Sequence, residues 1–158
     1  MNPSLKLFFL LLLVVVACDN KKPSTTSKSL NDFNKIVGRW GQIAVVINGN
    51  DVPNGAITQN GLIRYYTFKA DSTFTITMND SIREEGRWSI NDKVSPKIFD
   101  HTDHLKDPPY VVPGIYEIGE DIFKICIWDP KHGKEHPTKF VSKEENGSWI
   151  IILKRFPE

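Results

Sequence analysis

Apolar residues recur at every second position along most of this chain after Ile36. In the clearest run, Thr73 to Met78, two aromatic or aliphatic side chains and a methionine alternate with three threonines. Successive side chains of a β-strand point to opposite faces, so this pattern predicts a strand with one buried face. Comparable runs predict strands over residues 36–47, 62–69, 81–90, 111–118, 122–128, 138–142 and 149–156, with a short one at 97–100.

Turn-forming dipeptides separate these runs at short intervals. They are Asn48-Gly49, Ala70-Asp71, Asn79-Asp80, Asn91-Asp92, Gly119-Glu120 and Asn146-Gly147. Connections this short make neighbours in sequence pair in space. A meander of eight or nine strands closes most simply into a barrel, because closure removes exposed edges. The sequence therefore predicts an all-β fold, a small antiparallel up-and-down β-barrel, within residues 32–158.

One short helix is expected before the first strand. Ser29 and Asp32 have the spacing of a capping box. The helix would place Leu30, Phe33, and Ile36 or Val37 along one side. Such a side is suited to covering one end of the barrel.

The first seventeen residues have the pattern of a secretion signal. Lys6 precedes an unbroken apolar run over residues 7–16, and the small Ala17 precedes Cys18. The run is too short to span a hydrocarbon core of about 30 Å as a helix. Val15-Val16-Ala17-Cys18 resembles the lipobox of bacterial lipoproteins, which implies that Cys18 carries acyl chains such as palmitate. The expected location is therefore the cell envelope, with the domain tethered to a membrane outside the cytoplasm; an ordinary cleaved signal or an uncleaved anchor is the alternative.

Residues 18–31 form the lipid-bearing cysteine and a polar tether to the barrel. After the cysteine, this segment is rich in Lys, Ser, Thr and Asn and too poor in apolar residues to fold alone. Loss of Lys6 with the leader leaves 19 of the 20 Lys and Arg residues against 19 Asp and Glu. A neutral chain has no overall positive field to attract nucleic acid, so no nucleic-acid partner is expected.

The second cysteine, Cys126, has no partner once Cys18 is acylated. An intramolecular disulfide is then excluded even in an oxidising envelope. Cys126 lies within a predicted strand, and no catalytic pattern surrounds it. We interpret it as a buried, inert residue, with a reactive thiol as the alternative.

The order and spacing of several short motifs resemble a lipocalin-like domain family of uncharacterised bacterial proteins, first recognised largely in planctomycetes. The likeness covers nearly all of residues 36–156. It is carried by Gly38-Arg39-Trp40, Asn48-Gly49, Pro53, Tyr66 to Phe74, Glu85-Gly86, Gly114-Ile115-Tyr116, Lys124-Ile125-Cys126, Pro137 to Phe140 and Leu153-Lys154-Arg155.

The wider lipocalin pattern implies roles for three of these residues. Gly38 and Trp40 match its G-x-W motif, in which the indole plugs the bottom of the barrel. Arg155 matches an arginine of the last strand that stacks on that indole. What the resemblance implies is the barrel fold; known lipocalins bind small apolar ligands, whereas small members of the wider group can have packed interiors.

Two charged residues alternate with apolar neighbours and are expected to face the interior. Arg64 shares a face with Leu62, Tyr66 and Phe68; Glu84 shares one with Ile82, Gly86, Trp88 and Ile90. An unpaired buried charge costs several kcal/mol. Arg64 and Glu84 are therefore expected to pair with each other or with a ligand, or to extend to solvent at the barrel mouth. In the second case they would orient a ligand beside Tyr66 and Trp88.

Two histidine-containing segments resemble metal sites. His132 to His136 spells H-x-x-E-H, but Pro130, Gly133 and Pro137 prevent the helix that a zinc protease needs. In Asp100 to His104, the candidate metal ligands are His101, Asp103 and His104. The alternative is that this segment is a polar loop that happens to contain histidines and binds no metal. No resident metal or other cofactor is expected.

Conventional catalytic signatures are absent, which favours a non-enzyme. The leading functional hypothesis is a membrane-tethered module that binds a small apolar or amphipathic molecule. The alternative is an interaction or inhibitor lipoprotein with a packed barrel. Its loops at residues 100–110 and 129–137 would then contact another envelope protein.

Overall fold

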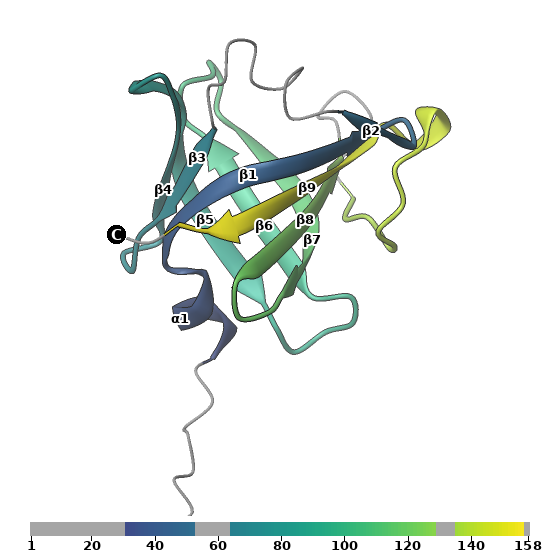
Figure 1. Ribbon diagram of the computed structural model, residues 1–158, viewed down its shortest axis with the longest axis horizontal. Helices are drawn as coiled ribbons and strands as arrows, with labels where there is room; N and C mark the ends of the chain where they lie inside the picture. Colours follow the sequence, from purple (N-terminus) through teal and green to yellow (C-terminus); the bar gives the residue numbers. More distant parts are fainter. Residues whose placement is uncertain (1–30, 53–63, 129–134, 157–158) are drawn as a thin grey trace, which may run out of the picture.

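The computed structural model describes residues 31–52, 64–128 and 135–156, which form a closed antiparallel barrel (Figure 1). The elements are α1 (Asp32–Ile36), β1 (Gly38–Ile47), β2 (Asn50–Val52), β3 (Tyr65–Phe68), β4 (Thr73–Met78), β5 (Ser81–Asn91), β6 (Ile98–Asp103), β7 (Tyr110–Ile118), β8 (Ile122–Trp128), the 3-10 turn η1 (Glu144–Asn146) and β9 (Ser148–Arg155). In the ring, β1 pairs with β3, each strand from β3 to β8 pairs with the next, and β9 pairs with β1. One additional strand, β2, pairs with β1.

The predicted all-β meander is confirmed, with eight strands in the closed ring. Closure comes from β1 and β9, whose register runs from Trp40 opposite Arg155 to Ile47 opposite Trp149. The hairpin between β4 and β5 turns at Asn79 and Asp80, which have φ of 53° and 57°. Positive φ at both central residues matches the right-handed twist of hairpin strands.

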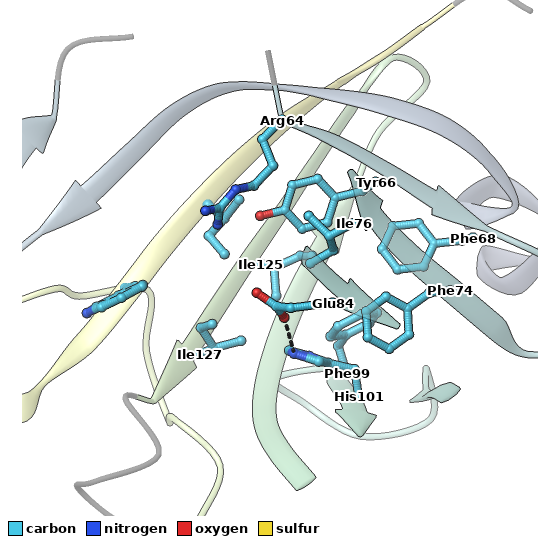
Figure 2. A pocket seen from close by; sticks show the side chains of 12 residues that line it. Arg64, Tyr66, Phe68, Phe74, Ile76, Glu84, Phe99, His101, Ile125 and Ile127 are labelled. Atoms are coloured by element: carbon cyan, nitrogen blue, oxygen red, sulfur yellow. Dashed lines mark ion pairs between the residues drawn. The ribbon is translucent and has the colours of Figure 1, made fainter. Parts of the chain in front are cut away.

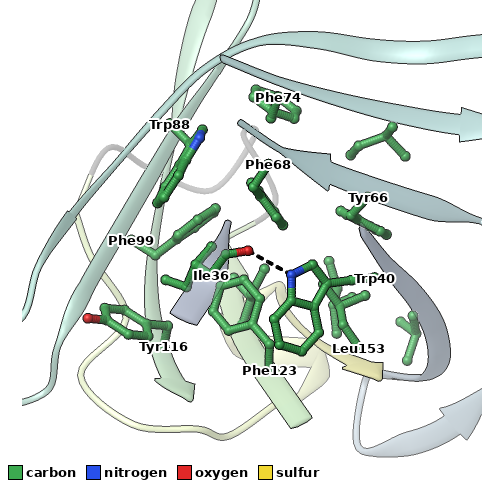
Figure 3. Close-up of a cluster of buried hydrophobic side chains, with 14 residues drawn as sticks. Ile36, Trp40, Tyr66, Phe68, Phe74, Trp88, Phe99, Tyr116, Phe123 and Leu153 are labelled. Atoms are coloured by element: carbon green, nitrogen blue, oxygen red, sulfur yellow. Dashed lines mark hydrogen bonds between the residues drawn. The ribbon is translucent and has the colours of Figure 1, made fainter. Parts of the chain in front are cut away.

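Aromatic and aliphatic side chains fill one end of the barrel, here called the closed end (Figure 3). Trp40 and Phe123 are fully buried there, with ring centroids 5.5 Å apart. The Trp40 indole Nε1 donates a 2.7 Å hydrogen bond to the carbonyl of Ile36, at the end of α1. Arg155 Cζ lies 4.2 Å from the centre of the Trp40 ring. Its guanidinium also donates to the carbonyls of Lys35 and Val37, which binds the last strand to the helix.

The structure corrects four details of the sequence analysis. Asn31, rather than Ser29, caps α1 and accepts from the amide of Asn34. The polar segment 100–103 is part of β6 rather than a loop. The short strand β2 was not expected. Residues 138–142 form no strand, because β8 already pairs with β7 and β9 and offers no free edge. The predicted leader, lipobox and tether, residues 1–30, lie outside the described residues, as do Leu62 and Pro53.

No helix among the described residues combines the length and apolarity needed to cross a bilayer.

Helix α1 is fastened to the barrel by a buried carboxylate. Asp32 Oδ2 lies 2.5 Å from Lys97 Nζ and accepts a 3.0 Å hydrogen bond from the Tyr116 hydroxyl. Burial acts to raise the pKa of Asp32, but the hydrogen bonds from Lys97 and Tyr116 outweigh it and lower the pKa below its usual value. The charged form of Asp32 therefore stabilises the folded state.

Replacement of Asp32 by Asn is expected to lower the melting temperature at neutral pH. A carboxylate with a lowered pKa contributes stability above its unfolded value, 3.8, and loses it as the pH falls through the folded pKa. The difference between wild type and Asp32→Asn should therefore shrink below about pH 4. Thermal unfolding from pH 2 to 7 measures this, with the exposed Glu117→Gln as control. A constant difference across that range would show that Asp32 acts without its charge.

Candidate functional site

The opposite end of the barrel, here called the mouth, carries the polar residues that face inward. The first residues of β3, β5, β7 and β9 and the last residues of β4, β6 and β8 lie at this end. An inner chamber of about 60 Å³ lies inside the mouth (Figure 2). It is lined mainly by aromatic and aliphatic side chains, with a polar group of Arg64, Tyr66, Glu84 and His101.

Arg64 directs its side chain into the barrel next to the Tyr66 ring (Figure 2). Its carbonyl accepts from the amide of Gln42 over 2.9 Å, which fixes the backbone against β1. The Tyr66 hydroxyl accepts from Arg64 and donates to Gln42 Oε1 over 3.0 Å. Arg64 Nε is buried and has no hydrogen-bond partner in the described part of the chain. No described carboxylate forms an ion pair with Arg64 either.

Glu84 faces the same chamber, in alternation with the buried Gly86 and Trp88 as expected, and a bulge in β5 lies just before it. Ile76 of β4 pairs with Glu84, but the next residue, Thr77, pairs with Ile82, so Arg83 is the extra residue. A bulge of this kind reverses the alternation of facing side chains. The bulge therefore turns Ile82 outward: it was expected on the same face as Glu84, and it is 51% exposed.

Burial sets the protonation state of two groups in the chamber. Burial raises the pKa of Glu84, and nearby Asp103 raises it further, while Arg64 and Lys106 act in the opposite direction. Burial lowers the pKa of His101 to about 4. The 3.8 Å between His101 Nε2 and Glu84 Oε2 is too long for a hydrogen bond, so it does not offset this burial. His101 is accordingly neutral at pH 7.

Substitution of Glu84 by Gln is expected to raise the melting temperature at pH 7. A carboxyl with a raised pKa is harder to ionise when folded, so the folded state loses stability as the pH rises from 4.5 through the folded pKa. The gain from Glu84→Gln should disappear towards pH 4. Melting curves at pH 4, 5.5 and 7 test this, with exposed Glu117→Gln as the control. A gain that persists at pH 4 would mean that ionisation is not its cause.

A second, larger pocket of about 240 Å³, here called the outer chamber, adjoins the inner one. Glu84, His101, Ile127 and Trp149 line both chambers. The outer one adds residues from the loop after β6 and from the ends of β7 and β8. These include Asp103, Lys106, Tyr110 and Trp128, and Arg83 of the bulge.

Two further buried polar atoms on the outer chamber lack partners within the described residues, Asp103 Oδ2 and Trp128 Nε1. Asp103 is almost fully buried, and its other oxygen accepts from the amide of Leu105 over 2.9 Å. Buried polar atoms in folded proteins are nearly always hydrogen-bonded, to the protein, to water or to a ligand. The mouth therefore offers two donors, from Arg64 and Trp128, and one acceptor, from Asp103.

Three of the four residues expected to contact a ligand come together in the inner chamber: Arg64, Tyr66 and Glu84. Trp88 lies elsewhere. Its ring stacks on Phe33 at 4.6 Å, and its Nε1 donates to the carbonyl of Thr73 over 3.2 Å. Trp88 thus belongs to the core beneath α1, although it faces inward as expected.

The other candidate residues are dispersed. His101 and Asp103 both face the interior, as expected for alternate residues of an extended segment. His104 is exposed, and its backbone amide donates a hydrogen bond to the carbonyl of Glu85. Nowhere in residues 31–52, 64–128 and 135–156 do three His, Cys, Asp or Glu side chains gather closely enough to hold a metal. Of the H-x-x-E-H residues, His132 lies outside the described residues, and His136 Nε2 lies 2.7 Å from Asp100 Oδ1. Cys126 is buried, which raises the pKa of its thiol.

Sequence reasoning missed Trp149 and Ile127, which lie opposite each other at the ends of β9 and β8. Both lie within predicted strands, but the pattern gave no reason to place them near Arg64. It also considered His101 only as a metal ligand. A signal for the mouth was present: Trp149 closely follows the turn at Asn146-Gly147, so it had to lie at one end of the barrel.

Comparison of the chain with protein-family models, with curated proteins and with solved structures found no match.

Proposed function

We propose that this protein is a lipid-anchored lipoprotein of the cell envelope whose lipocalin-like barrel binds a small apolar or amphipathic molecule at its mouth. The single observation that most supports binding is the set of three unpartnered polar atoms, on Arg64, Asp103 and Trp128. Leaving such atoms unpaired costs each about 1–3 kcal/mol, and a ligand that pairs with them recovers that cost.

The shape of the mouth supports a small ligand rather than a long one. The chambers, of about 60 and about 240 Å³, are each smaller than the roughly 300 Å³ at which ligand pockets usually begin. Below them, the closed end is filled by rings such as Trp40, Phe68 and Phe123. An acyl chain of many carbons has no room to extend along the barrel axis.

Native mass spectrometry of the protein purified from its host membrane tests both parts of the proposal. The expected spectrum has a chain that begins at Cys18 with added acyl mass, and a second species with a bound small molecule. Cys18→Ser should abolish the acyl mass. A chain that retains residues 1–17, or lacks acyl mass, would refute the anchor; a chain without any co-purifying molecule would count against the binding role.

The small inner chamber favours one competing role, that of an interaction or inhibitor lipoprotein. At about 60 Å³ it holds only a few atoms. Leu105, in the loop between β6 and β7, is 49% exposed and could contact another envelope protein. The second loop of that hypothesis, residues 129–137, lies mostly outside the described residues. A protein of defined mass bound in the native spectrum, in place of a small molecule, would favour this role.

A further inference from the structure

The mouth contains a cation, Arg64, whose buried Nε has no hydrogen-bond partner among the described residues. The carbonyl of Arg64 accepts from β1, and its side chain donates to the neutral Tyr66 hydroxyl. An inward-facing charge is costly unless a group of opposite charge accompanies it. Arg64 and Glu84 interact electrostatically across the chamber but form no close ion pair within the described residues, so the Arg64 guanidinium retains a donor for a further anion.

We propose that the ligand of the mouth is a compact organic anion whose charged group binds the Arg64 guanidinium. This inference rests on the proposed binding function and specifies the chemical class of the ligand. A guanidinium offers donors in a planar fork that matches carboxylate, phosphate or sulfonate oxygens. These groups share the required chemistry, so the proposal covers all three.

The charges around the chambers favour an anion over a cation. Arg64, Arg83 and Lys106 line the two chambers, against the carboxyl groups of Glu84 and Asp103. The cations therefore outnumber the carboxyl groups at the mouth. The excess gives a positive field even though the chain as a whole is near neutrality.

The remaining unpartnered atoms define the rest of the molecule. Trp128 Nε1 offers a second donor in the outer chamber, and Asp103 Oδ2 requires a donor from the ligand, such as a hydroxyl or amide. Trp149 lines both chambers and is 38% exposed, so its ring is available to a flat apolar body. The inner chamber admits a group about the size of two water molecules. The ligand is thus compact, with its body mainly in the outer chamber.

Three probes of similar shape and different charge test the proposal: benzenesulfonate, benzenesulfonamide and benzylamine. Calorimetric titration uses the full chain in lipid nanodiscs. Benzenesulfonate is expected to bind about 10- to 100-fold more tightly than the neutral sulfonamide, the range of a charge-assisted hydrogen bond. Benzylamine is expected to bind more weakly than either.

The variant Arg64→Gln should remove the preference for benzenesulfonate, and Arg64→Lys should retain part of it. Arg87→Gln is the matched control, because it removes the same charge from an exposed side chain of β5 that donates to the carbonyl of Asp71 and lies outside both chambers. Melting curves establish that each variant is folded. Equal affinity for the three probes, or an anion preference that survives Arg64→Gln, would overturn the inference while leaving ligand binding intact. Failure of all three probes to bind would overturn it together with the proposed function, provided that native spectra also lack a bound molecule.

Discussion

Gly86→Ala is expected to destabilise the barrel by about 3 kcal/mol or more, since it forces an atom into occupied space. A Cβ at Gly86 would lie 1.7 Å from the carbonyl oxygen of Thr102 on the neighbouring strand and 3.3 Å from the Phe74 ring. Backbone cannot move aside cheaply there, because Gly86 pairs with β4 on one side and β6 on the other. Denaturant unfolding measures the loss.

The matched control for this prediction is Gly119→Ala. A Cβ at Gly119 would lie 3.7 Å from the nearest atom, the carbonyl oxygen of Ile122, which is ordinary contact. Its stability should change by less than about 1 kcal/mol. Should Gly86→Ala fold as stably as wild type, β5 and β6 cannot be as close as described. Asp103, which pairs directly with Gly86, would then not be fixed at the mouth as the binding proposal requires.

His101→Phe is expected to protect the protein against mild acid. The neutral His101 ring packs at 5.2 Å from Phe74 and 5.9 Å from Phe99, so phenylalanine can replace it with little change in packing. In the unfolded chain the same histidine takes up a proton near pH 6.5, but when folded only near pH 4. The unfolded state therefore binds more protons in this interval, and wild type loses about 3 kcal/mol as the pH falls through it.

Urea unfolding at pH 7, 5.5 and 4 measures this effect. Relative to wild type, His101→Phe should gain stability progressively between pH 6.5 and 4 and show no such gain above pH 7. His104→Gln is the control, because His104 is exposed on the following turn. If wild type and His101→Phe lose stability in parallel on acidification, His101 must become protonated inside the barrel without cost.

The alternation of apolar and polar residues predicted which side chains point into the barrel, but not where along the barrel axis each one lies. Arg64 and Trp88 both point inward, as their neighbours implied. One lies at the mouth and the other beneath α1, because the height of a residue depends on the stagger between neighbouring strands. That stagger is set by pairings distant in sequence, such as Ile47 with Trp149, which local patterns do not contain.

Bulges and buried polar residues limited the prediction of the site. The extra residue Arg83 reverses the alternation of β5, and nothing in Ser81 to Glu85 signals it. In β6, His101 and Asp103 read as loop residues because strands seldom bury such groups. They are buried here at the mouth, where their unusual surroundings define the candidate site. The candidate site is thus marked by buried polar residues, which depart from the usual pattern of apolar residues inside and polar residues outside.

The anchoring of α1 at the closed end has a practical consequence for the orientation of the molecule. Arg155 donates to the carbonyl of Lys35, and the amide of Phe156 donates to that of Arg39, so the first and last described residues leave the barrel at the same pole (Figure 1). The mouth occupies the other pole. A label attached directly at Asn31 or Phe156 would therefore lie far from the opening and leave it accessible to solutes.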